Sequence, residues 1–96
     1  MTKYRLDLGA NRRMIERLPG NIRQRIKRVL AALCDNPRPG AAKPLDGELT
    51  GYYRLRIDRY RVIYTINEKI VTVVIVRVGQ RDNDPYKGLP SVDRGS

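Results

Sequence analysis

Polar and apolar positions at the start of the chain predict one strand followed by one helix. Residues 3–8, KYRLDL, alternate between polar and apolar, which is typical of a short strand. Ala10, Met14 and Leu18 then recur every four residues, as they would on one side of a helix. The Pro-Gly pair at 19–20 is expected to end this helix.

A second and clearer helical pattern follows directly. Its apolar residues lie on one stripe: Ile22, Ile26, Val29, Leu30 and Leu33. Asn21 is expected to cap its N-terminus, and the helix is expected to end around residues 36–37. Because only a short Pro-Gly turn separates the two helices, we expect them to form an antiparallel hairpin.

The second half of the chain is rich in β-branched and aromatic residues. Residues 37–50, rich in Pro, Gly and Ala, predict a loop. The runs 52–57, 60–66 and 70–78 follow, separated by very short breaks, and predict three strands in an antiparallel meander. The predicted fold is therefore α+β: an N-terminal strand, a two-helix hairpin, then a three-stranded meander with both helices on one face.

The length of 96 residues fits one domain. We expect residues 1–87 to form it and residues 88–96 to be a flexible tail. No apolar run reaches the roughly 18 residues that span a bilayer, and the N-terminus does not have the pattern of a signal peptide. A cytoplasmic protein without a membrane partner is therefore expected.

Charge and missing residue types narrow the chemistry. Twenty Lys and Arg against ten Asp and Glu give a net charge of +10, which favours a polyanionic partner: nucleic acid, an anionic membrane or an acidic protein. The absence of histidine excludes Cys/His zinc sites, Ser-His-Asp triads and a histidine base. The single cysteine, Cys34, excludes an internal disulfide and is expected to be buried on the helical stripe.

Several arginines are predicted to share one face of the sheet. On the first meander strand the apolar odd-numbered residues suit the core, so Arg54 and Arg56 point to the opposite face. Arg61 on the next strand is expected beside them, with Arg81 and Tyr86 at the end of the sheet. Guanidinium groups bind phosphate and a tyrosine stacks on an unpaired base, which predicts an RNA site. The alternative is that these arginines are solvated and protect a sheet edge from aggregation.

The same residues carry a resemblance to a known family. The stretch 51–81, GYYRLRIDRYRVIYTINEKIVTVVIVRVGQR, resembles the RelE toxins of the RelE/ParE superfamily, most strongly over residues 53–64. Residues 36–37 followed by residues 43–45 resemble the family's loop after the helices, and residues 78–81 with a tyrosine shortly afterwards complete the pattern. The resemblance covers residues 3–87.

The resemblance implies a microbial ribonuclease-like fold and a type II toxin with a RelB-like antitoxin. It also implies cleavage of mRNA in the ribosomal A site, by attack of the 2′-hydroxyl and without a metal or other cofactor. The residues that match the family's catalytic positions are Arg54, Arg56, Arg61, Arg81 and Tyr86. Two features depart from the family pattern: arginines replace the common lysines at 54 and 56, and Tyr86 comes one residue early, after Pro85. Tyr86 is expected either to stack on a base next to the cut or to accept the proton.

Further basic residues are expected to contact RNA, and three alternative functions stay open. Lys43, Arg59 and Lys87 are expected to add phosphate contacts. Asp82 and Asp84 allow a metal nuclease, although adjacent carboxylates are more common as simple turn residues. The ParE branch shares the fold and inhibits DNA gyrase without cutting RNA, and a non-catalytic RNA-binding module would use the same arginines.

Overall fold

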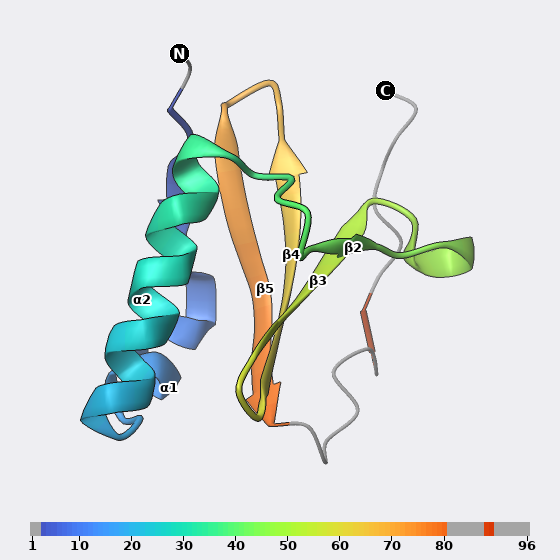
Figure 1. The fold of residues 1–96 in the computed structure, drawn as a ribbon. Coiled ribbons are helices and arrows are strands. Elements are labelled where there is room, and N and C mark those ends of the chain that lie inside the picture. The colour runs from blue at the N-terminus through green and yellow to red at the C-terminus, as the bar shows by residue number, and fades with distance from the viewer. Residues whose placement is uncertain (1–2, 81–87, 90–96) are drawn as a thin grey trace.

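The computed structural model of the protein describes residues 3–80 and 88–89. The helices are η1 (Gly9–Asn11), α1 (Arg12–Glu16), α2 (Gly20–Asp35) and η2 (Gly47–Leu49), where η denotes a 3-10 helix. The strands are β1 (Arg5–Asp7), β2 (Lys43–Pro44), β3 (Tyr52–Ile57), β4 (Tyr60–Asn67) and β5 (Thr72–Gln80). Both α1 and α2 lie on one side of a single sheet (Figure 1). The α+β prediction is confirmed, whereas the division into residues 1–87 and 88–96 stays a prediction.

The sheet has five strands in the order β1-β5-β4-β3-β2. Strands β3, β4 and β5 form the predicted antiparallel meander. Strand β1 pairs with β5 in parallel, so the sheet is mixed. A parallel pair needs a long connection, and here the helices and the other strands provide it.

The predicted loop 37–50 contains a second edge strand, which corrects the prediction. Strand β2 pairs antiparallel with β3, and Lys43 lies opposite Arg54. The N–H of Leu45 also donates to the carbonyl of Tyr52 at 2.9 Å. Two residues that include a proline are a weak strand signal, so only the pairing with β3 reveals this edge.

Predicted boundaries of the second helix and of the last strand were wrong, and the last strand also ends at Gln80 and not at residue 78. Asn21 is not the N-cap, because α2 begins at Gly20 and the carbonyl of Pro19 accepts the N–H of Arg23 at 2.8 Å. The last strand begins at Thr72 and not at residue 70, because Val71 has a φ of 49° that breaks extended backbone. A positive φ at a β-branched residue is uncommon and is not visible in the sequence pattern.

The first helix is shorter than its pattern suggested. Ala10 lies in η1 and is exposed, while Ile15 is the buried residue of α1. The side chain of Asn11 donates to the carbonyl of Ile75 at 3.1 Å and accepts from the N–H of Val78 at 3.3 Å. These bonds attach the start of α1 to β5, which also carries side chains on the opposite face of the sheet.

The core lies between the helices and the sheet. It combines Ile15 and the buried face of α2 with residues of the three meander strands: Ile26, Leu30, Leu33, Leu55, Ile57, Val62, Tyr64, Val73 and Ile75. Cys34 is buried as predicted, and burial raises the pKa of its thiol. Among the described residues, none of the helices has the length and apolar character needed to cross a bilayer.

Candidate nucleic-acid interface

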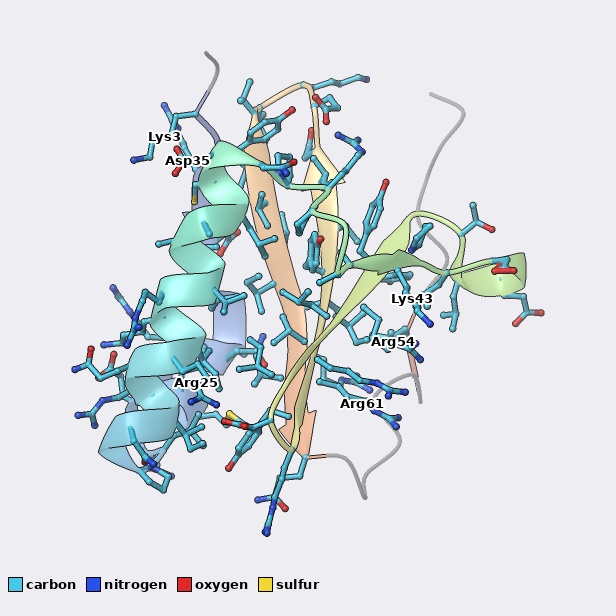
Figure 2. All side chains as sticks on the ribbon, viewed as in Figure 1. Lys3, Arg25, Asp35, Lys43, Arg54 and Arg61 are labelled. Atoms are coloured by element: carbon cyan, nitrogen blue, oxygen red, sulfur yellow. The ribbon has the colours of Figure 1, made fainter. Side chains whose placement is uncertain are left out.

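Five basic residues share the face of the sheet that is turned away from the helices. Pairing places them together, because directly opposed residues of neighbouring strands point to the same side. Arg54 lies opposite both Lys43 and Ile63, while Arg56 lies opposite Arg61. Figure 2 shows the labelled side chains of Lys43, Arg54 and Arg61 on this side, away from α2. We call the following residues the basic face: Lys43, Arg54, Arg56, Arg61 and Arg77.

An apolar residue lies at the centre of the basic face. Ile63 is fully buried, although the helices cover the other side of the sheet. It is the Cα partner of Arg54 on β3 and of Arg77 on β5. Ile63 therefore separates Arg54 and Arg77 on this face without itself offering exposed surface.

Arg61 has an unusual environment within this face. Its side chain is half-buried, and its Nε is buried without a hydrogen-bond partner among the residues that the structure describes. A buried donor without a partner costs free energy, roughly 1–3 kcal/mol and more for a charged group. A second guanidinium, that of Arg56, belongs to the residue directly opposite. Both conditions favour an anion at this position.

A small cavity of about 120 Å³ lies beside this pair. Arg56 and Arg61 line it together with Arg59, which is in the turn between β3 and β4. Asp58 is its only acidic lining residue within the described part of the chain, and its carboxylate pairs with Arg25 of α2. This ion pair ties the turn, where Asp58 has a φ of 55°, to the helix layer.

Tyr53 of β3 and Tyr64 of β4 have structural roles on the helix side of the sheet. The rings of Tyr53 and Tyr64 stack, with centroids 5.4 Å apart and planes 19° from parallel. The hydroxyl of Tyr64 donates to the carbonyl of Pro37 at 2.8 Å, and burial raises the pKa of Tyr64 to about 12. Tyr64 is therefore unsuited to accept a proton from RNA.

Arg38 connects the stacked tyrosines to residues at the surface. Its Nε donates to the hydroxyl of Tyr53 at 3.1 Å, and its guanidinium pairs with Glu68 at 3.1 Å. The hydroxyl of Tyr4 donates to the same carboxylate at 2.8 Å. Arg38 thus connects the loop after α2 to the β4–β5 turn and the N-terminal segment, and it was not predicted from the sequence.

The structure brings together the predicted site residues that it describes. Arg54, Arg56, Arg61 and Lys43 lie on the basic face, and Arg59 lines the cavity beside it. The remaining predicted residues lie outside the described residues: Arg81, Tyr86 and Lys87. The same is true of Asp82 and Asp84, and within the described residues no group of three or more His, Cys, Asp or Glu could hold a metal ion.

Arg77 belongs to the basic face but was missed. Simple alternation along β5 places Arg77 with Val73 and Ile75, which face the core. The pairing with β4 has an irregularity, however: Ile63 lies opposite Arg77, whereas Tyr64 lies opposite Ile75. Val76 is therefore an extra residue, and a bulge of this kind reverses the faces of the residues beyond it.

Comparison with known proteins identifies the family. Residues 10–85 match the profile of a family described as the ParE toxin of the type II toxin–antitoxin system parDE. No curated protein matches the chain. Because the profile covers more than half of the sequence, the chain belongs to this toxin family, within the RelE/ParE superfamily of type II toxin–antitoxin systems.

Solved structures agree with this membership. The RelBE2 toxin–antitoxin complex of Mycobacterium tuberculosis contains a similar chain with 32% identity and a TM-score of 0.70, matched over 82% of this chain and 99% of that chain. The archaeal RelE–RelB complex of Pyrococcus horikoshii gives 27% identity and a TM-score of 0.69, over 88% and 100%. The intact RelBE complex of E. coli gives 25% identity and a TM-score of 0.70, over 83% and 99%.

Proposed function

We propose that this toxin is a ribosome-dependent endoribonuclease that cuts mRNA in the A site, in the cytoplasm and without a metal. The observation that carries the proposal is the pairing of Arg56 with Arg61, where a buried Nε has no partner among the described residues. Two opposed guanidiniums carry like charges and repel each other, whereas both can donate hydrogen bonds to a phosphate group beside the small cavity.

The proposed reaction uses the RNA itself as nucleophile. The 2′-hydroxyl attacks the adjacent phosphorus, the bond to the 5′-oxygen breaks, and the products are a 2′,3′-cyclic phosphate and a 5′-hydroxyl. One proton leaves the 2′-oxygen and one reaches the 5′-oxygen. Alignment of the two oxygens contributes about 7–11 kcal/mol, and each well-aimed guanidinium about 3 kcal/mol by analogy with oxyanion-hole donors.

Each basic residue has a proposed role. Arg61 and Arg81 clamp the scissile phosphate, while Arg54 and Arg56 bind it and its neighbours. Lys43, Arg59 and Lys87 add contacts to the RNA backbone. Tyr86 stacks on the base next to the cut or accepts the 2′ proton, a role for which Tyr64 is unsuited because its hydroxyl is already donated to Pro37.

Primer extension on ribosomes programmed with a defined message tests the proposal. The wild-type toxin should produce a cut in the A-site codon, and Arg61→Ala should lower its rate at least a hundredfold. Arg13→Ala is a matched control, because Arg13 is exposed on α1, on the other side of the sheet. A message that stays intact with the wild-type toxin, or equal rates for wild type and Arg61→Ala, would refute the proposal.

The proposed partner of this toxin is a RelB-like antitoxin, since the similar solved chains are found in RelB–RelE complexes. Such a partner needs acidic and apolar side chains to cover the basic face. Adding the cognate antitoxin should abolish cleavage. Cleavage that continues at full rate in the complex would contradict this part of the proposal.

A second candidate function is inhibition of DNA gyrase. The observation in its favour is that the matching family profile is that of ParE. A supercoiling assay with purified gyrase, run beside the ribosomal assay, separates the two functions. Inhibition of supercoiling by both wild type and Arg61→Ala, with an intact message, would favour gyrase as the target.

A further inference from the structure

We infer that Arg77 is a further RNA-binding residue, which contacts a backbone phosphate next to the one held by Arg61. This inference deepens the proposed function and rests on it for the identity of the ligand. Arg77 lies on β5. Neither the sequence pattern nor the family resemblance assigned a site residue to this strand.

The position of Arg77 follows from the pairing of the strands. Arg77 lies opposite Ile63, and Ile63 lies opposite Arg54, so the two arginines flank the buried isoleucine. Two strand spacings, about 10 Å, separate their backbones. Long side chains at this distance can contact neighbouring phosphates of one RNA strand.

The bulge at Val76 places the side chain of Arg77 on the basic face. Without the extra residue, Arg77 would point into the core with Ile75, where burying a charge is costly. Bulges often redirect a side chain next to a functional site. Here the redirected residue is a cation, and it joins four others on the basic face.

Salt-dependent binding of a short single-stranded RNA tests the role of Arg77 apart from catalysis. A protein that loses one phosphate contact loses about 0.7 from the slope of log affinity against log salt concentration. We therefore expect Arg77→Gln to reduce this slope and to raise KM more than it lowers kcat on ribosomes. Arg77→Lys should restore the slope, because it keeps the charge.

The controls separate this inference from the proposed function. Arg13→Gln removes the same charge from α1 and should leave the slope unchanged. A wild-type slope for folded Arg77→Gln would overturn the inference, as would a reduced slope that Arg77→Lys does not restore. If the wild-type toxin cuts no RNA but Arg77→Gln still reduces the slope, the proposed function fails and the binding role of Arg77 stands.

A separate observation concerns Gly79, and we propose that it keeps space open for RNA beside Arg61. Gly79 is the Cα partner of Arg61 on β5. Its φ is not positive, and among the residues that the structure describes a Cβ built there meets nothing within 4 Å. Glycine weakens a strand, so neither the backbone nor the packing explains its presence.

Substitutions of increasing size test this proposal. Gly79→Ala and Gly79→Val should melt at or above the wild-type temperature, while RNA binding and cleavage fall stepwise with side-chain size. Gly40→Ala is the control, because a Cβ at Gly40 also meets no atom of the described residues within 4 Å and Gly40 lies outside the paired strands. Wild-type RNA affinity in Gly79→Val would overturn the proposal, and so would a loss of affinity matched by a loss of thermal stability.

Discussion

The opposed pair of Arg56 and Arg61 should cost the isolated toxin stability. Residues that face each other on antiparallel strands have Cβ atoms about 5 Å apart, and like charges in this position are destabilising. Arg56→Gln removes one charge and keeps a long polar side chain. We therefore expect the variant to be more stable than the wild type.

The magnitude follows from Coulomb's law. Two unit charges about 6 Å apart repel by about 0.7 kcal/mol in water and by about 2.8 kcal/mol at an effective dielectric constant of 20. Arg56 is exposed and can swing away, whereas Arg61 is half-buried, so the lower end applies. A gain of about 0.5–1 kcal/mol raises the melting temperature of a domain of this size by roughly 2–8 °C.

Thermal melts at two salt concentrations provide the assay. The Debye length is about 30 Å at 0.01 M salt and about 3 Å at 1 M, so the gain should be large in the first and small in the second. Arg13→Gln controls for the lower net charge of the whole molecule. A melting temperature for Arg56→Gln that equals the wild-type value at low salt, or a gain that persists in 1 M salt, would refute the reasoning.

Three further predictions concern the other side of the sheet. Tyr64→Phe should lower the free energy of unfolding by about 1–2 kcal/mol in denaturant melts, because the buried Pro37 carbonyl loses its donor; an unchanged value would contradict this. The hydrogen bond from Tyr4 lowers the pKa of Glu68, so the stabilisation by the Glu68 carboxylate should be present above about pH 4.5 and be lost as pH falls through the lowered pKa. Melts of Glu68→Gln at several pH values should lack this loss. Identical pH profiles for the variant and the wild type would contradict this prediction. Burial raises the pKa of Cys34, so a thiol reagent should label it much more slowly in the folded protein than in denaturant, and equal rates would count against its burial.

The sequence predicted the meander well because its strands are long and alternate clearly. The buried faces of β3 and β4, and with them the orientation of Arg54, Arg56 and Arg61, follow from parity and short turns alone. The orientation of these side chains depends only on neighbouring residues in the sequence, so a single sequence is enough to predict it.

The missed features depend on contacts between distant segments. The bulge at Val76 exists only through pairing with β4, and strict alternation would place Arg77 on the helix side of the sheet. The interaction of Arg38 with Tyr53 and Glu68 joins three separate segments, and β2 is recognisable only beside β3. The start of β5 was misplaced because the positive φ of Val71 has no signature in the residue type.

The parallel pairing of β1 with β5 has a consequence for how the toxin is made. The strand that begins the chain finds its partner 67 residues later, where Arg5 meets Thr72. Translation must therefore reach β5 before β1 can pair, and contacts this distant in the sequence form slowly. A partly synthesised toxin lacks β5, and with it both Arg77 and the strand that pairs with Arg61, so the basic face is complete only after β5 has been made.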